Sequence, residues 1–167
     1  DTPKRWTKAL NQSVIQTINQ VHQSFKTHEI PATVTTFEPW KSKPLYQKFA
    51  QILIKEYKGT DLEKSTFRLL DLIENLEEEH NFINIDKVLI HNDFNPRNLA
   101  IRADNRVCIY DWELAVLNFP HRDIVEWLSF ALPLNFDTKD ALSYLKYHYD
   151  LQENPTTWAE WKKGYSY

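Results

Sequence analysis

The first half of the chain carries apolar residues at the three-to-four-residue spacing of amphipathic helices. Three helices are expected, at residues 3–26, 45–58 and 61–80. In the first, Thr2 is the expected N-cap and Pro3 occupies the first helical position. Gly59 ends the second, and Thr60 and Glu63 have the spacing of a capping box for the third. The pattern therefore predicts a long helix, a proline-rich connection and two further helices.

From Val88 onward the pattern changes to short β-prone runs. These runs cover residues 88–90, 99–102 and 107–110. Asp104 and Asn105 lie between the last two runs and favour a tight turn. The last two runs are therefore expected to form a β-hairpin.

Helical spacing returns after this insert, where helices are expected at residues 120–132, 138–150 and 155–163. A chain of 167 residues with 42% hydrophobic residues is long enough for one globular core. We expect a single domain over residues 1–167, of the α+β class but mainly helical, with one small hairpin.

Composition and charge exclude several functional classes. The net charge of −3 comes from interspersed acidic and basic residues, without the basic stripe that nucleic-acid binding requires. No stretch has the length and apolarity of a membrane span. Cys108 is the single cysteine, so a disulfide or a multi-cysteine metal site is not expected. We expect no nucleic-acid partner, no membrane insertion and a cytoplasmic location.

Polar residues with chemical potential gather in and directly after the β insert. Residues 91–98 read His-Asn-Asp-Phe-Asn-Pro-Arg-Asn, and residues 110–113 read Tyr-Asp-Trp-Glu. Phosphoryl transfer needs a group that positions the attacking hydroxyl, and oxygen ligands for magnesium ions that neutralise the phosphates. Asp93 is the candidate for the first task, and Asn98 with Asp111 for the second.

The motif H-x-D-x-x-x-x-N, followed by an apolar strand that ends in Asp-Trp-Glu, resembles the aminoglycoside phosphotransferase and choline kinase families. The resemblance implies a protein-kinase-like fold and an ATP- and Mg²⁺-dependent phosphotransferase that acts on a small-molecule hydroxyl. It assigns Asp93 as the catalytic residue and Asn98 and Asp111 as magnesium ligands. Glu113 becomes a further metal ligand, and His91 supports the loop.

Two more positions match the family pattern. Pro120-His-Arg-Asp-Ile is similar to the start of a family helix whose aspartate braces the catalytic loop by accepting backbone N–H groups, which implies this role for Asp123. The first helix resembles the family helix that follows the hinge between the two lobes, and it places His22 near its end.

The resemblance also implies a part that these residues do not supply. Kinases of this type have a preceding β-rich lobe with a glycine-rich loop over the phosphates, whereas this sequence has only Gly59 and Gly164. The expectation is a C-terminal catalytic lobe without its ATP-clamping partner lobe. Without that partner, the C-terminal lobe is expected to be inactive. The rest of the parent chain is then its partner, besides the small-molecule substrate.

Alternatives remain open at this point. The lobe could be a non-catalytic scaffold or pseudokinase module, and its motifs also resemble phosphotransferase-type domains joined to hydroxymethylglutaryl-CoA reductase. Aromatic residues could line a cation-binding box or simply form core. The candidates for such a box are Trp127, Trp158, Trp161, Tyr165 and Tyr167.

Overall fold

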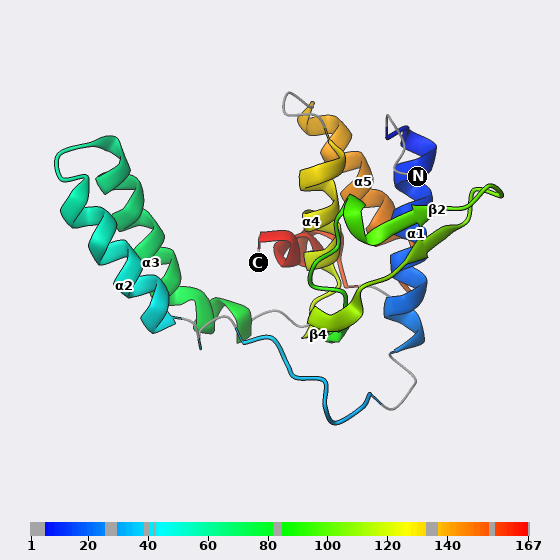
Figure 1. The fold of residues 1–167 in the computed structure, drawn as a ribbon, viewed down its shortest axis with the longest axis horizontal. Helices are drawn as coiled ribbons and strands as arrows, with labels where there is room; N and C mark the ends of the chain where they lie inside the picture. The colour runs from blue at the N-terminus through cyan, green and yellow to red at the C-terminus, as the bar shows by residue number, and fades with distance from the viewer. Residues whose placement is uncertain are drawn as a thin grey trace. The chain divides into compact units, whose positions relative to one another are not determined.

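The structure, a computed structural model, describes residues 6–25, 30–38, 41, 43–81, 85–132, 137–153 and 156–166. Its contacts divide the chain into two compact units, residues 1–36 with 85–167 and residues 37–84, where the sequence predicted one domain. Figure 1 shows both, and each is described by itself. The fold is mainly helical with small antiparallel strand pairs, which confirms the predicted class.

Helix α1 (Lys8–Ser24) supplies one wall of the larger unit's core. It starts after Thr7, whose Oγ1 accepts a hydrogen bond from the Leu10 N–H at 3.2 Å. The predicted start at residue 3 is therefore too early, while Thr2 and Pro3 lie outside the described residues. Both threonines precede apolar positions at helical spacing, so the sequence pattern alone does not separate the two starts.

Helices α4 (His121–Ala131) and α5 (Thr138–Asp150) pack against α1 and close this core. Trp127 of α4 is fully buried between Trp6, at a ring-centroid distance of 4.5 Å, and Phe94 of the loop at residues 91–98, at 5.7 Å. Burying an aromatic side chain of this size stabilises the fold more than most single residues do. The same side chain therefore anchors both the helices and the loop that carries the candidate chemistry.

The C-terminal segment covers the start of α4. Helix α6 (Trp158–Trp161) continues into the 3₁₀ helix η4 (Lys162–Ser166). Gly164 of η4 lies so close to His121 that a Cβ there would be 2.6 Å from the imidazole ring. The helix predicted at residues 155–163 thus begins later, after the N-cap Thr157, and Pro155 lies outside the described residues.

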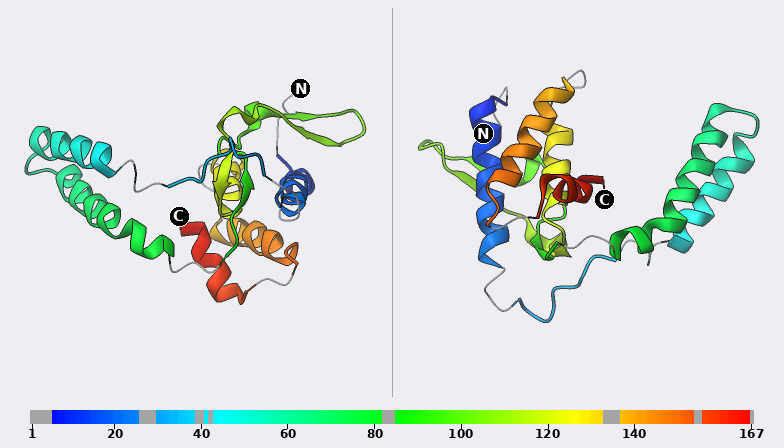
Figure 2. Two further views of the ribbon diagram at one scale, coloured as in Figure 1. Left: turned by 90° about the horizontal axis from the view of Figure 1, so that it is seen from below. Right: turned by 180° about the vertical axis from the view of Figure 1, so that it is seen from behind.

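Two antiparallel strand pairs flank the candidate site. Strands β2 (Leu99–Ile101) and β3 (Val107–Ile109) form the predicted hairpin, whose turn extends away from the helices (Figures 1 and 2). Strand β1 (Val88–Ile90) lies where the sequence predicts a strand, and it pairs with β4 (Val116–Asn118), a strand that the sequence pattern does not predict. The β1–β4 pair places the start of the loop at residues 91–98 next to the end of the turn at residues 111–115.

The smaller unit is a helical hairpin of α2 (Lys43–Glu56) and α3 (Asp61–Asn81). Gly59 turns the chain between them with a φ of 82°, a conformation that glycine adopts without strain. Glu63 accepts the Gly59 N–H at 2.7 Å. This differs from the predicted capping box, in which Glu63 would reach the N–H of Thr60.

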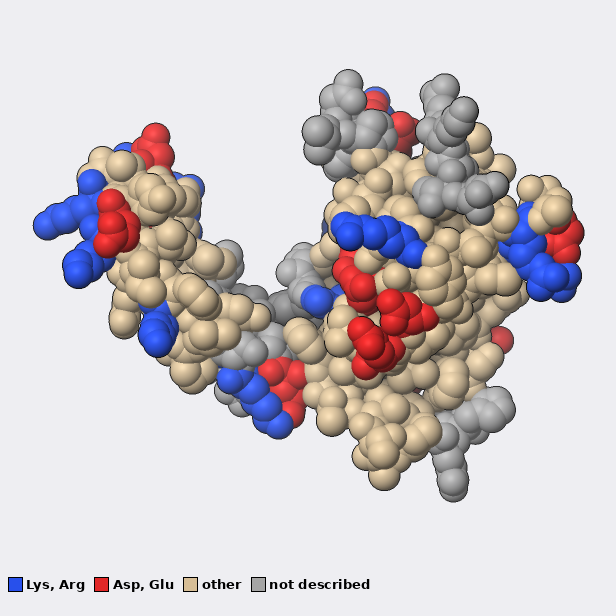
Figure 3. Space-filling view, viewed as in Figure 1, with Lys and Arg blue, Asp and Glu red and all other residues tan. Residues whose placement is uncertain are grey.

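No helix in the described parts of the chain combines the length and apolarity needed to cross a membrane. On the face of the larger unit that Figure 3 shows, acidic and basic side chains form small separate groups. Figure 3 shows no continuous basic surface among the coloured atoms of that face.

Candidate active site

The loop after β1 reverses the chain within a few residues. Its second residue, Asn92, has a φ of 64°, in the left-handed region that asparagine tolerates better than most side chains. The short 3₁₀ helix η2 (Pro96–Asn98) then starts at Asn95, whose Oδ1 accepts the Arg97 N–H at 3.0 Å. The sequence Asn-Asp-Phe-Asn-Pro thus forms a tight turn that holds Asp93 at its centre.

Two asparagine amides fix the carboxylate of Asp93. Asn95 Nδ2 donates to Asp93 Oδ1 at 2.9 Å, and Asn98 Nδ2 donates to Asp93 Oδ2 at 2.8 Å. Because the Asn98 amide uses its nitrogen for Asp93, its oxygen is the atom that remains for a metal. The structure therefore brings the predicted base and one predicted metal ligand into direct contact.

His91 connects the loop to the residue before Asp111. Its Nε2 lies 2.8 Å from the carbonyl oxygen of Tyr110, and its Nδ1 lies 3.3 Å from the Asp93 backbone nitrogen. A carbonyl accepts and an N–H donates, so this arrangement requires a neutral imidazole with the proton on Nε2. The buried ring also contacts Trp112 at 4.7 Å. His91 is thus a structural bridge between the two motifs.

Asp111 and Glu113 lie in the short turn that follows β3, and both side chains are exposed. Asp111 has a φ of 66°. The preceding residue, Tyr110, is attached to the loop at residues 91–98, because its N–H donates to Asn98 O at 3.1 Å and its hydroxyl donates to Arg97 O. This attachment places the turn with Asp111 beside the loop with Asn98.

The donor set has the chemistry that magnesium prefers, namely carboxylate and amide oxygens. No group of three His, Cys, Asp or Glu side chains suited to a metal ion occurs among the described residues. A metal at this place would therefore depend on the amide oxygen of Asn98 together with Asp111. Such a mixed oxygen set fits magnesium, which keeps several waters, better than zinc.

Asp123, in the first turn of α4, supports the loop from inside the core. Its fully buried carboxylate accepts the His91 N–H at 2.8 Å and the Asn92 N–H at 3.0 Å. Its Oδ2 also lies 2.9 Å from Nε2 of the buried His22. The family resemblance implied that Asp123 accepts backbone N–H groups of this loop, and the contacts of Asp123 also bring His22 to the same point.

Two side chains next to Asp123 were missed from the sequence. Arg122 Nε donates to Asn92 Oδ1 at 2.7 Å. Glu126, one turn later on α4, is half-buried, and this burial raises the pKa of its carboxyl, as do the charges of Asp123 and Asp93, while the Phe94 backbone N–H lowers it. The spacing of Asp123 and Glu126 on one helix face is the signal that could have found the second residue.

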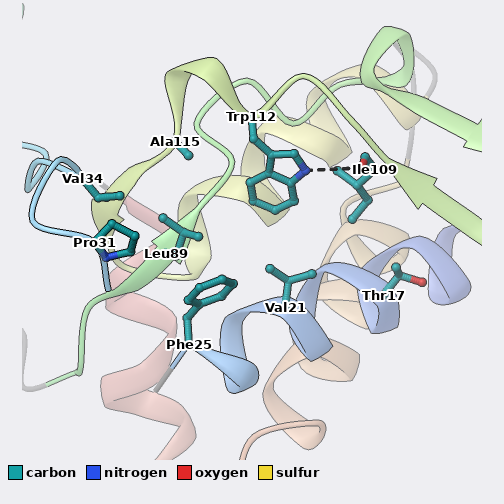
Figure 4. A pocket seen from close by; sticks show the side chains of 9 residues that line it. All are labelled: Thr17, Val21, Phe25, Pro31, Val34, Leu89, Ile109, Trp112 and Ala115. Carbon is teal, nitrogen blue, oxygen red and sulfur yellow. Dashed lines mark hydrogen bonds between the residues drawn. The ribbon is translucent and has the colours of Figure 1, made fainter. Parts of the chain in front are cut away.

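A pocket of about 520 Å³ lies beside Trp112 and is lined by residues of α1, β1 and β3 and by Pro31, Val34 and Ala115 (Figure 4). The Trp112 indole N–H donates to Ile109 O at 3.3 Å, which fixes its ring at the edge of this pocket. Apart from the Thr17 hydroxyl, the lining side chains are apolar. The described lining side chains therefore offer no charged group for a phosphate or a metal ion, whereas the loop offers several polar side chains.

Of the candidate residues for an aromatic box, Trp158, Trp161 and Tyr165 come together, whereas Trp127 lies elsewhere. Trp127 lies in the core beside Trp6, whereas Trp161 and Tyr165 surround His121, at ring distances of 4.3 and 4.6 Å. Burial lowers the pKa of His121 to about 3. Tyr167 lies outside the described residues. The cluster around His121 is an uncharged part of the core.

Comparison with known proteins identifies the chain's relatives. The sequence model of the phosphotransferase enzyme family matches residues 7–161, almost the entire chain. A search of curated protein sequences finds no match.

Solved structures with the same fold include the choline kinase LicA from Streptococcus pneumoniae (TM-score 0.62, 18% identity), of which the match covers 50%, and 94% of this chain. The gentamicin–APH(2'')-IIa complex (TM-score 0.53, 18% identity) matches over 52% of its length and 95% of this chain. Aminoglycoside-3'-phosphotransferase of type VIII (TM-score 0.56, 14% identity) matches over 61% and 96%. The chain thus spans about half the length of the solved relatives it matches.

Proposed function

Because the chain belongs to the phosphotransferase enzyme family, we propose that these residues form the catalytic loop of an enzyme that transfers a phosphoryl group from ATP to a hydroxyl of a small molecule. The observation that carries this proposal is the fixed carboxylate of Asp93. Two amides hold it, and the loop that bears it rests on the buried Asp123. Preorganised groups of this kind supply most of the catalysis in phosphoryl transfer.

In this mechanism Asp93 accepts or orients the proton of the attacking hydroxyl. One carboxylate oxygen is bonded to Asn95 and the other to Asn98, so the carboxylate cannot rotate freely as the acceptor arrives. Phosphoryl transfer needs little covalent chemistry from the protein. The main task of the loop is therefore to hold the hydroxyl in line with the phosphate.

Magnesium, when bound, neutralises charge on the phosphates. We assign Asn98 Oδ1 and the Asp111 carboxylate as its protein ligands, and Glu113 as a further acidic group of the same turn. Three hydrogen bonds connect Tyr110 with His91, Arg97 and Asn98, and they support this assignment because they keep the turn beside the loop.

ATP binding needs groups that this chain does not contain. Residues that wrap nucleotide phosphates are usually glycine-rich loops, and the only glycines here lie in the helical hairpin turn and in η4. Since the chain spans about half of its solved relatives, we assign the nucleotide clamp to a part of the full-length parent other than these 167 residues. The chain alone is then expected to be inactive, and the complete enzyme to work in the ATP-rich cytoplasm.

The experiment that tests this proposal measures phosphate transfer from ATP by the full-length parent over a panel of choline, aminoglycosides, amino alcohols and sugars. Asp93→Asn is expected to lower kcat about 10²- to 10⁴-fold, the usual contribution of a positioned acid or base. Asp104→Asn, in the exposed β2–β3 turn, is the matched control and is expected to keep full activity.

Two results would contradict the proposal. If Asp93→Asn retains the activity of Asp104→Asn, then Asp93 is not the catalytic group. If the full-length parent binds no ATP in the presence of magnesium, the lobe is a scaffold, and the site residues only hold its fold.

A further inference from the structure

Asn92, between His91 and Asp93, has an unusual backbone conformation. Its φ of 64° lies in the left-handed region, where a Cβ atom costs energy that glycine would avoid. A side chain at this position therefore needs a compensating role. The contacts of the Asn92 amide provide one.

The Asn92 amide connects two different elements. Its Oδ1 accepts a hydrogen bond from Arg122 Nε of α4 at 2.7 Å, and its Nδ2 donates to the carbonyl oxygen of Leu114 at 3.1 Å. Arginine only donates and a carbonyl only accepts, so each partner fixes the same orientation of the amide. The Asn92 side chain is therefore a defined strut from α4 to the turn that contains Asp111.

We propose that Asn92 is a positioning residue that couples the loop of Asp93 to the turn of Asp111. The inference rests on the proposed function, because it assigns these two aspartates to base and metal. The turn from Asp111 to Leu114 is held at its start by the bonds of Tyr110 to the loop and at its end by the bond from Asn92 to Leu114.

Removing the Asn92 side chain is expected to affect Asp111, the proposed metal ligand, more than Asp93, the proposed base. Asp93 keeps its own amide bonds when the strut is removed. Asp111, by contrast, is exposed and its side chain makes no capping bond, so its direction depends on how the turn is held. Loss of the strut is expected to weaken magnesium binding while the binding of the acceptor is unchanged.

The chain offers a matched control for the test. Asn105, in the β2–β3 turn, also has a left-handed backbone, with a φ of 62°, and it is exposed. Asn92→Gly and Asn105→Gly make the same chemical change and relieve the same kind of strain. Only the first removes bonds to Arg122 and Leu114.

The first measurement needs no substrate. The Ala115 N–H closes the turn by donating to Trp112 O at 3.0 Å, and its hydrogen exchange in the whole chain can be followed by NMR. Asn92→Gly is expected to speed this exchange about fivefold, as the loss of one hydrogen bond of ordinary net strength would. Unchanged exchange at Ala115, or the same acceleration in Asn105→Gly, would overturn the proposal.

The second measurement uses the full-length parent. Asn92→Gly is expected to raise the magnesium concentration for half-maximal activity about fivefold, with the KM of the acceptor unchanged. Asn105→Gly should match the unaltered protein. A lower kcat with unchanged magnesium dependence would contradict the coupling. If the unaltered parent transfers no phosphate, the proposed function fails, whereas the exchange at Ala115 still tests the strut.

Discussion

The two units of the chain differ in what their side chains do. In the larger unit, α1, β1 and α4 bury apolar residues completely, among them Ile15, Ile90 and Trp127. In the helical hairpin of α2 and α3, Ala50 and Thr66 are the only buried residues among the described side chains. Large apolar residues there, such as Phe49 at 57%, remain exposed. Helical backbone bonds form locally in both units, but among the described side chains a packed core is seen in the larger unit alone.

This difference explains where the chemistry lies. Asn92 of the loop and Asp111 of the turn both have a positive φ, and the loop rests on the buried carboxylate of Asp123. Such conformations need a rigid support, because they persist only when the surroundings determine them. The core under α4 provides this support.

The largest effect is expected from truncating the aromatic centre of the core. Trp127→Ala should lower the free energy of unfolding by about 3–5 kcal/mol, because it leaves a cavity beside Phe94 and Trp6. Phe49→Ala in α2 should cost no more than about 0.5 kcal/mol. Urea unfolding followed by circular dichroism measures both. Similar losses in the two variants would show that the hairpin has a core of its own.

A smaller contrast is expected at the two glycines. Gly164→Ala places a methyl group 2.6 Å from His121 Cε1, and such overpacking costs about 1–3 kcal/mol. Gly59→Ala meets no atom within 4 Å and suffers only from its φ of 82°, at about 1 kcal/mol. Thermal unfolding compares the two. Gly59→Asn and Gly164→Asn separate backbone strain from steric clash. Asparagine tolerates the positive φ of Gly59 better than alanine does, but its larger side chain increases the clash at Gly164.

The pH dependence of stability provides a third comparison. Burial lowers the pKa of His121 to about 3 and also lowers that of the neighbouring His148. The unfolded chain then binds more protons than the folded chain between about pH 6.5 and pH 3, so stability falls as the pH falls through this window. His121 alone should contribute about 1.4 kcal/mol between pH 7.5 and 5.5. Unfolding of His121→Phe at both pH values should show a smaller difference.

The smallest effect on stability is expected for an ion pair on the surface of the helical hairpin of α2 and α3. Lys43 Nζ lies 2.7 Å from Glu74 Oε2, and this hydrogen bond lowers the pKa of the exposed Glu74 carboxyl. Exposed ion pairs contribute little, and salt screens them. Lys43→Gln should lower the melting temperature slightly at low salt and leave it unchanged at 1 M salt. A loss that persists at high salt would indicate packing by the lysine stem.

The sequence predicted those parts of the fold that depend on local patterns. The helix expected at residues 138–150 has the same bounds in the structure, and the β2–β3 hairpin lies where Asp104 and Asn105 predicted its turn. Strand β4 was missed because its partner β1 lies far away in the sequence, so no turn signal connects the two strands as it does for β2 and β3. Pairings of this kind become visible only in three dimensions.

The same limit applies to the site. The spacing of Asp93 and Asn98 and the Asp-Trp-Glu segment were sufficient to find the loop and the turn, and the Asp123 carboxylate lies against the loop as the pattern predicted. The strut from Arg122 through Asn92 to Leu114 was not predictable. It joins the Asn92 side chain to the Arg122 side chain and to the Leu114 carbonyl, which lie far from Asn92 in the sequence. No spacing in the sequence marks these groups as partners.

The close approach of Gly164 to His121 has a practical consequence for shortening this protein. His121 begins α4, and the next two residues, Arg122 and Asp123, hold the loop that bears Asp93. A version that ends before Trp158 would expose the His121 ring to water and remove the packing on the first turn of α4. Trimming a tail far from the loop in sequence would thus loosen the loop itself.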